Sequence, residues 1–150
     1  MKVVILCGGK GTRAYPYTEY MPKPLLPING TPIVVQVMQS YAAQGFTEFV
    51  LSVGYRKEVI ADYFRDKQMA WKVELVDTGD ETDTGGRIEK CRHVLGDTFF
   101  ATYADGLSDV DLNALLAFHR GHGGLATITG APLPSQYGTM ITEDSGQIRS

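Results

Sequence analysis

Two cations follow closely on a cluster of glycines near the start of this 150-residue chain. Gly8, Gly9 and Gly11 come directly after an apolar run, and Arg13 and Lys23 come after the glycines. Glycines allow positive φ angles and let main-chain N–H groups approach a ligand closely. Phosphate oxygens suit both those donors and the two side-chain cations. The stretch therefore predicts a phosphate site, although ordinary surface ion pairs are the alternative for each cation taken alone.

Two familiar phosphate motifs fit this stretch poorly. The Walker A pattern G-x-x-x-x-G-K-[ST] does not occur in the sequence. Gly9, Gly11 and Ala14 match the dinucleotide-binding pattern G-x-G-x-x-A, but that motif needs a helix beginning within the glycines. The four prolines between positions 16 and 27 oppose such a helix, because proline removes a backbone donor and restricts its neighbour. We expect a long, stiff loop, with a dehydrogenase-like site as the least favoured alternative.

Two later polar stretches are further candidates for binding. Asp105 comes just after an apolar run and precedes Gly106, where a carboxylate can hold a Mg²⁺ ion that also bridges phosphates. An ordinary Asp-Gly turn is the alternative. Thr82, Gly86 and Arg87 lie in a polar stretch that suits nucleobase, ribose or phosphate contacts. A mobile surface loop at a helix start is the alternative there.

The elements that must position these residues follow from the apolar periodicity. We expect buried strands over residues 3–7, 49–53, 73–77, 98–103 and 125–130. We expect helices that begin at Thr31–Pro32, follow Gly54, run from Arg87 to Gly96 and start near Asp109 or Asp111, then a hairpin over 137–142 and 147–150. This alternation predicts an α/β, Rossmann-like fold, a mostly parallel sheet with helices on both faces. The loops at 8–13, 78–87 and 104–109 should then converge on one crevice beyond the strand ends.

The composition favours one globular domain over residues 1–150. The chain is 43% hydrophobic and 21% charged, which allows one compact core. Its net charge of −3 argues against a general nucleic-acid surface. No run reaches the ~20 apolar residues of a membrane helix, and the N-terminal run is too short for a secretory signal. Cys7 and Cys91 are expected to be inert buried thiols, so we expect a cytoplasmic protein.

Residues 8–33, GGKGTRAYPYTEYMPKPLLPINGTPI, resemble the signature of the sugar-1-phosphate nucleotidyltransferases. That signature reads G-G-x-G-T-R, then P-x-T, P-K-P and G-x-P-I. Residues 75–88, LVDTGDETDTGGRI, and residues 102–106, TYADG, are most similar to the glucose-1-phosphate cytidylyltransferase branch. The resemblance implies a glycosyltransferase-A-like nucleotidyltransferase fold. Because members of the family are longer, it also implies a truncated chain, with a sugar-binding part beyond residue 150.

The resemblance further implies the activity and the roles of individual residues. It implies transfer from a nucleoside triphosphate, with CTP favoured, to a sugar 1-phosphate, with glucose 1-phosphate favoured, in a Mg²⁺-dependent homo-oligomer without nucleic-acid or membrane partners. Thymidylyl, uridylyl or guanylyl transfer and a non-catalytic nucleotide-binding regulatory module stay open as alternatives. Arg13 and Lys23 would be catalytic, and Asp105 would hold the metal. The substrate-binding residues would be Leu6, Gly8, Gly9, Gly11, Thr12, Arg13, Lys23, Thr82, Gly86 and Arg87.

Overall fold

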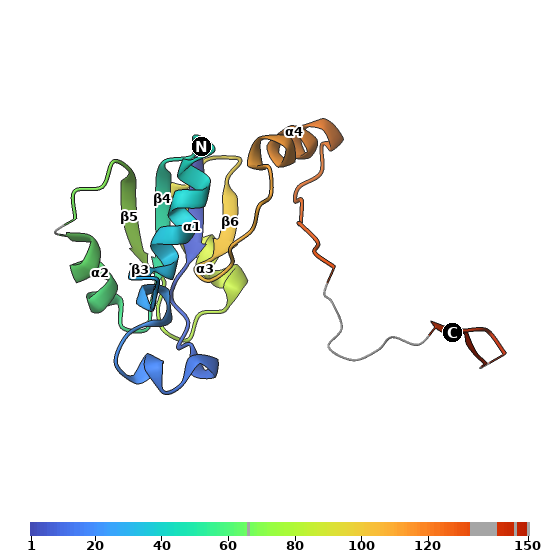
Figure 1. The fold of residues 1–150 in the computed structure, drawn as a ribbon. Coiled ribbons are helices and arrows are strands. Elements are labelled where there is room, and N and C mark those ends of the chain that lie inside the picture. Colours follow the sequence, from blue (N-terminus) through green and yellow to red (C-terminus); the bar gives the residue numbers. More distant parts are fainter. Residues whose placement is uncertain (66, 133–140, 146, 150) are drawn as a thin grey trace. The chain divides into compact units, whose positions relative to one another are not determined.

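A parallel four-stranded sheet forms the centre of the chain in the computed structural model, which describes residues 1–65, 67–132, 141–145 and 147–149 (Figure 1). The strands lie in the order β5-β4-β1-β6, and each neighbouring pair is parallel. Their bounds are β1 Lys2–Leu6, β4 Glu48–Val53, β5 Lys72–Asp77 and β6 Phe100–Tyr103. The predicted α/β fold with a mostly parallel sheet is confirmed.

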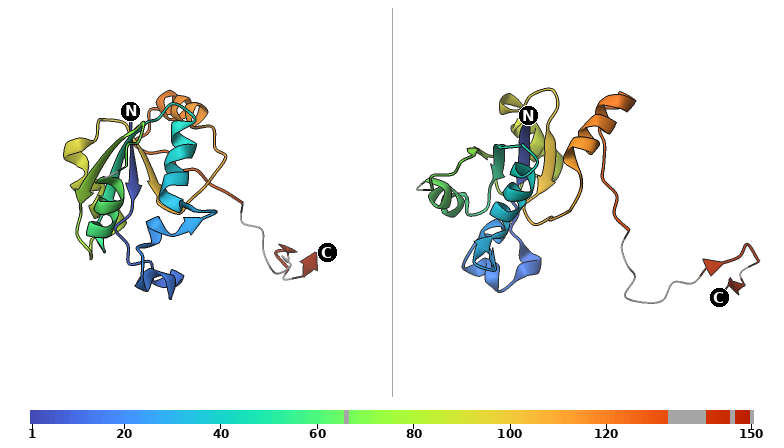
Figure 2. Two further views of the ribbon diagram at one scale, coloured as in Figure 1. Left: turned by 60° about the vertical axis from the view of Figure 1, so that its left-hand side comes forward. Right: turned by 45° about the horizontal axis from the view of Figure 1, so that its top comes forward.

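Helices cover both faces of this sheet because consecutive apolar side chains on its buried strands point to opposite faces. Val3 and Ile5 join one core cluster with residues of α1 and α2, whereas Val4 joins a second cluster with Cys91, just after α3. Figure 2 shows α1 and α3 on opposite sides of the sheet. The helices are α1 Ile33–Ala42, α2 Lys57–Arg65, α3 Thr84–Lys90 and α4 Leu112–His122. Both cysteines are buried and free, as expected.

The strand order reverses at β1. From β1 the chain goes to β4 and β5 on one side, then returns to β6 on the other side of β1. In Figure 1 the carboxyl ends of these strands point to the lower edge of the sheet. In open parallel sheets, the crevice beyond the strand ends at such a reversal is the usual ligand site.

The chain divides into two compact units, residues 1–115 and residues 116–150. The first unit holds the whole parallel sheet and α1 to α3. The second holds the end of α4 and a short antiparallel pair, β7 Ile141–Thr142 with β8 Ile148–Arg149. Within the described ranges, no helix is long and apolar enough to cross a bilayer. The interpretation of residues 1–150 as one domain stays a prediction.

The strand predicted over residues 125–130 is wrong. Residues 123–132 form neither helix nor strand, and the side chains of Leu125 and Ile128 are almost fully exposed. An apolar alternation makes a strand only where a neighbouring strand satisfies its backbone. Of the predicted C-terminal hairpin, residues 141–142 and 148–149 do pair, while 137–140, 146 and 150 lie outside the described residues.

Two predicted helix starts are also displaced. Thr31–Pro32 is a strand, β3, paired with β2 Pro27–Ile28 in a hairpin whose two turn residues, Asn29 and Gly30, have positive φ. The helix α1 therefore begins at Ile33. The helix α3 begins at Thr84 rather than at Arg87, because Asp83 caps it by accepting a 2.6 Å bond from a backbone N–H of the first turn. It ends at Lys90, before a 3₁₀ turn over Arg92–Val94, rather than at Gly96.

Candidate active site

The segment between β1 and β2 folds as three short 3₁₀ turns and contains no α-helix. The turns are Thr12–Ala14, Tyr17–Glu19 and Lys23–Leu25. The prolines explain this, because the nitrogen of each proline carries no hydrogen to donate and the residue before each proline avoids α-helical angles. The segment is thus non-α-helical, as expected, and it is folded into short turns. In Figure 1 it forms the blue loop below the sheet.

The part of this segment around Thr18 and Lys23 packs back against the glycine loop at Gly11. The φ angle of Gly11 is 66°, a left-handed conformation that other residues adopt only with strain. A Cβ atom built there would lie 3.0 Å from the Cβ of Lys23 and 3.0 Å from the Cγ2 of Thr18. Thr18 in the second turn and Leu25 in the third turn are buried, so they fix this part of the segment. Lys23 is therefore held directly against the glycine loop.

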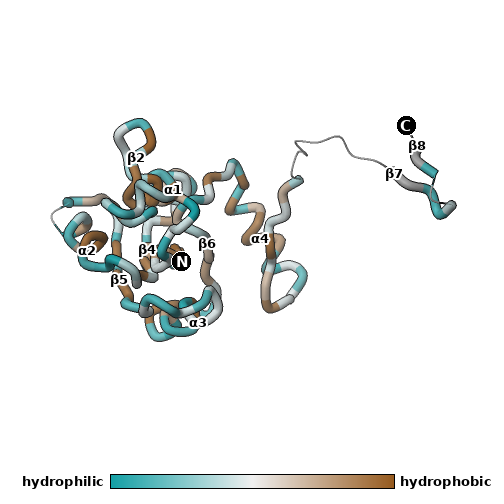
Figure 3. The backbone as a smooth tube through the Cα atoms, turned by 90° about the horizontal axis from the view of Figure 1, so that it is seen from below, coloured by the Kyte–Doolittle hydropathy of each residue, from teal (hydrophilic) through white to brown (hydrophobic). Residues whose placement is uncertain are grey.

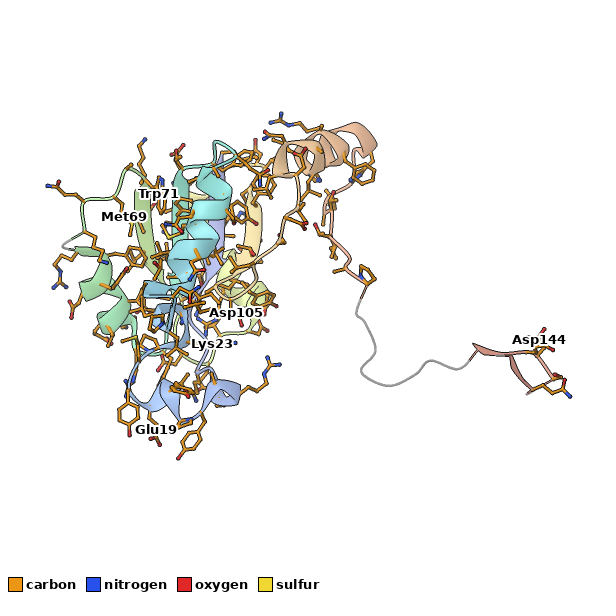
Figure 4. All side chains as sticks on the ribbon, in the orientation of Figure 1. Glu19, Lys23, Met69, Trp71, Asp105 and Asp144 are labelled. Carbon is orange, nitrogen blue, oxygen red and sulfur yellow. The ribbon has the colours of Figure 1, made fainter. Side chains whose placement is uncertain are left out.

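Lys23 forms an ion pair with Asp105 at the reversal of the strand order. Lys23 comes from the segment after β1 and Asp105 from the end of β6, and these strands are neighbours in the sheet. The two side chains are 34% and 37% exposed, so each can still reach a ligand. Figure 4 shows the two labelled side chains next to each other. The described residues contain no cluster of three His, Cys, Asp or Glu that could hold a metal unaided.

Arg87, by contrast, is a buried residue with protein partners. Its side chain is 5% exposed. Its guanidinium donates hydrogen bonds to Thr78 Oγ1 at 2.7 Å, to the Gly8 carbonyl at 3.0 Å and to the Asp80 carbonyl at 3.0 Å. The side chain also lines the cavity described below. A direct contact between Arg87 and a nucleobase or phosphate stays a prediction.

The other predicted residues of this loop also have partners within it. Thr82 Oγ1 donates to the Thr78 carbonyl at 2.5 Å and accepts from Lys90 Nζ at 2.9 Å. The N–H of Gly86 donates to the capping carboxylate of Asp83. These bonds give the loop a defined shape, and the choice between a binding loop and a mobile surface loop at a helix start stays a prediction.

An ion pair that the sequence analysis did not anticipate joins the two loops. Lys10 Nζ lies 2.5 Å from Glu81 Oε1. The hydrogen bond and the opposite charge raise the pKa of Lys10 and lower the pKa of Glu81. Both side chains are exposed, so the pair contributes little to stability. The sequence signal for this pair is that Lys10 and Glu81 carry opposite charges in two loops that are predicted to converge.

A cavity of about 550 Å³ lies where the three predicted loops meet. Most predicted site residues line it, which agrees with the expected convergence. They are Leu6, Gly8, Gly9, Gly11, Thr12, Arg13, Lys23, Thr82, Arg87 and Asp105. Gly86 is not in the lining, although its neighbours Asp83 and Thr84 are. Arg13 is exposed and forms no ion pair with any described residue, which leaves its guanidinium available to a ligand.

The chemistry available in this cavity is charge stabilisation rather than covalent catalysis. Cys7 is the thiol in its lining, and burial raises the pKa of that thiol far above its usual value, with Arg87 opposing the shift only in part. A neutral thiol is a poor nucleophile. The remaining groups are backbone donors and charged side chains of both signs; the cations are Lys10, Arg13, Lys23 and Arg87, and the carboxylates are Asp80, Glu81, Asp83 and Asp105. Such a set suits a bound polyanion whose charge is neutralised during a displacement.

Comparisons with known proteins agree with this chemistry. The model of a family described as "Nucleotidyl transferase" matches residues 2–150. A probable glucose-1-phosphate cytidylyltransferase of Bacillus subtilis is 40% identical over 96% of this chain and 65% of its own length. A glucose-1-phosphate cytidylyltransferase of Salmonella typhi is 36% identical over 100% of this chain and 67% of its own length. The chain thus spans about two thirds of these relatives.

A solved structure has the same fold. The crystal structure of HddC from Yersinia pseudotuberculosis, complexed with GMP-PN, aligns with a TM-score of 0.67 at 26% identity. The alignment covers 79% of this chain and 53% of that protein.

Proposed function

Because this chain belongs to the nucleotidyl transferase family, we propose that its protein joins a nucleoside triphosphate to a sugar 1-phosphate. A phosphate oxygen of the sugar 1-phosphate attacks the α-phosphorus of the triphosphate in line. A new P–O bond forms, the bond from the α-phosphorus to the bridging β-phosphate oxygen breaks, and pyrophosphate leaves. The products are a nucleoside-diphosphate sugar and pyrophosphate. The protein's task is to align two polyanions and to stabilise the charge that develops between them.

The glycine loop and two of the cations in the cavity each have a role in this reaction. The backbone N–H groups of residues 8–12 bind the triphosphate. Arg13, with its planar fork, binds the departing β- and γ-phosphates, and Lys23, a compact point charge, binds the α-phosphate. The pairing of Lys23 with Asp105 across this cavity is the observation that carries the proposal.

A Mg²⁺ ion fits the residues present. Mg²⁺ in such sites is held by one or two carboxylates together with substrate phosphates and water, rather than by a complete protein cage. Asp105 supplies one accessible carboxylate in the lining of the cavity, and the triphosphate would supply the other ligands. When bound, the ion would neutralise charge on the phosphate oxygens. We expect Asp105→Asn to weaken Mg²⁺ binding in the presence of nucleotide, measured by calorimetry; unchanged binding would remove Asp105 as a ligand.

We propose CTP and glucose 1-phosphate as the preferred substrates. The support is the sequence similarity to the two glucose-1-phosphate cytidylyltransferases. Guanylyl transfer is the second candidate, because the Yersinia structure with the same fold holds GMP-PN. Pyrophosphate release by the intact protein, measured with each common nucleoside triphosphate, glucose 1-phosphate and Mg²⁺, separates the two. Turnover with GTP but not CTP would overturn the cytidylyl assignment.

The role of Lys23 is tested with a matched ion pair elsewhere. Lys23→Ala should lower turnover ~10²-fold or more, the usual scale for one preorganised charge-stabilising group. Lys57 forms a comparable exposed pair with Asp77 at 2.6 Å and does not line the cavity, so Lys57→Ala serves as the control. Equal turnover of the two variants would exclude Lys23 from the mechanism. Binding of nucleotide without any turnover by the wild type would instead favour a regulatory module.

A further inference from the structure

A second cavity lies beside the segment that carries Lys23. It has a volume of about 540 Å³ and shares no described lining residue with the first cavity. Its walls come from residues 21–27, the β2–β3 hairpin, α1, α2 and the stretch between α2 and β5. In Figure 3, brown hydrophobic stretches mark β2, α1 and α2. The size is that of a small-molecule site.

Apolar side chains form most of the lining of this second cavity. Leu25 and Val35 are buried within it, whereas Met21 and Val59 line it and remain exposed to solvent. Apolar surface in a concave site gains free energy when an apolar ligand covers it. The second cavity therefore suits the apolar body of a ligand, in contrast to the polar and charged first cavity.

The hairpin wall of the second cavity is held in place from α1. Gln36 Nε2 donates to the Ile28 carbonyl at 2.9 Å and to the Thr31 carbonyl at 3.0 Å. The N–H of Ile33 donates to the Leu26 carbonyl at 3.1 Å, which closes the other end of the hairpin. A wall that is already fixed loses little conformational freedom when a ligand binds.

Lys67 gives the second cavity a positive charge. It is the one charged side chain among the described lining residues, and it forms no ion pair with any described residue. Its Nζ donates to Tyr63 Oη at 2.8 Å and lies 4.0 Å from the centre of the Tyr63 ring. Two further N–H donors of the ammonium group stay available. An anionic group on an apolar ligand would complement this charge.

We propose that the second cavity binds a small aromatic monoanion, and that the bound anion lowers turnover by moving Lys23. Lys23 and Leu25 belong to the same 3₁₀ turn, yet Lys23 lines the first cavity and Leu25 the second. The N–H of Leu26 donates to the Lys23 carbonyl at 3.1 Å, so this turn is a closed unit. A ligand that displaces Leu25 therefore displaces Lys23. The effect on turnover rests on the proposed function, whereas the binding does not.

The test of binding uses anilinonaphthalene sulfonate, an aromatic monoanion whose fluorescence rises in apolar surroundings. Titration of the intact protein should show saturable binding at one site. Phenylnaphthylamine, the same aromatic body without the sulfonate, should bind about tenfold more weakly because it cannot pair with Lys67. Saturating CTP with Mg²⁺ should leave the sulfonate bound. Displacement by CTP would place the probe in the first cavity and overturn the inference.

Substitutions in the lining locate the bound probe. Lys67→Gln should weaken binding of the sulfonate about tenfold and leave binding of phenylnaphthylamine unchanged. Val59→Asp, which adds a carboxylate at an exposed position of the lining, should also weaken binding of the sulfonate. Lys72→Gln is the matched control, because Lys72 is an exposed lysine outside the lining. The urea midpoint shows that each variant is folded, and wild-type affinity in folded Lys67→Gln would refute the site.

The effect on turnover is measured separately. At saturating probe, kcat for pyrophosphate release should fall on the order of fivefold, since a misplacement of about 1 Å can cost ~10²-fold and this shift is smaller. The KM for CTP should stay unchanged. At the same probe concentration, Lys67→Gln should keep most of its kcat. Binding with an unchanged kcat would overturn the coupling to Lys23. A wild type that turns over no nucleoside triphosphate would refute the proposed function and the coupling, while the probe titrations decide the binding site independently.

Discussion

Replacing Gly11 with alanine should impair catalysis by moving Lys23. The backbone at Gly11 has a φ of 66°, and a left-handed alanine costs about 1–2 kcal/mol in the free energy of unfolding. The new Cβ would also lie 3.0 Å from atoms of both Thr18 and Lys23, which is too tight. Since Thr18 is buried, the segment that carries Lys23 must give way. Overpacking of this kind adds about 1 kcal/mol to the loss.

The displacement predicts the size of the effect on turnover. Relief of the contact needs a shift of a few tenths of an ångström, whereas a misplacement of about 1 Å can cost ~10²-fold in rate. We therefore expect kcat to fall on the order of tenfold in Gly11→Ala. Pyrophosphate release by the intact protein at saturating substrates gives kcat, and urea unfolding gives the stability.

Gly45 provides a matched control on the same sheet unit. Its φ is 93°, and no atom lies within 4 Å of a Cβ built there. Gly45→Ala should lose about the same 1–2 kcal/mol through backbone strain, with kcat unchanged. If Gly11→Ala also kept the wild-type kcat, Lys23 would not be positioned through its contact with Gly11.

Further predictions concern three other residues of the same unit. Asp83→Ala removes the cap of α3 and should lower the free energy of unfolding by about 1 kcal/mol in urea titrations; an unchanged midpoint would mean that the cap is dispensable. The Cys7 thiol should react with a disulfide reagent at pH 8 only as fast as the protein unfolds, because burial keeps its pKa raised. For the same reason the neutral Cys7 thiol stabilises the fold below the pKa that the thiol has in the unfolded chain, and this stabilisation is lost as the pH rises toward the raised pKa of the folded protein. Cys7→Ala should therefore flatten the alkaline decline of the urea midpoint. Glu81→Gln should weaken the link between the two loops and leave the urea midpoint at pH 7 unchanged, because the Lys10–Glu81 pair is exposed.

The sheet was predictable because its two central strands, β1 and β4, are buried on both faces. Residues 3–5 and 49–53 are continuous apolar or small runs, as parallel strands require, and they lie at the centre of the sheet. Residues 125–130 have a similar composition, but strand formation depends on a neighbour that the local pattern does not contain. The helices α1 and α3 begin elsewhere than predicted because Asn29-Gly30 forms a hairpin turn and Asp83 caps α3.

The meeting of Lys23 with Asp105 was also predictable in outline. Parallel strands bring their carboxyl ends to one edge, so any two of the loops there must lie close together. The burial of Arg87 was not predictable in this way. Arginine is ordinarily exposed. The space for the Arg87 guanidinium exists only because Gly8 and Gly54, which follow two other strands, have no Cβ atom to fill it. That space is a property of three segments together and is invisible in any one of them.

Two of the cations that line the cavity, Lys23 and Arg87, are held in opposite ways. Lys23 is partly exposed and paired with a carboxylate, so a phosphate or a divalent ion that competes for either partner can separate the pair at low cost. Arg87 is buried, is bonded to neutral oxygens and cannot leave without stranding them. A charge that must follow the reacting phosphorus needs the first arrangement. A charge that links the loops after β1 and β5 needs the second.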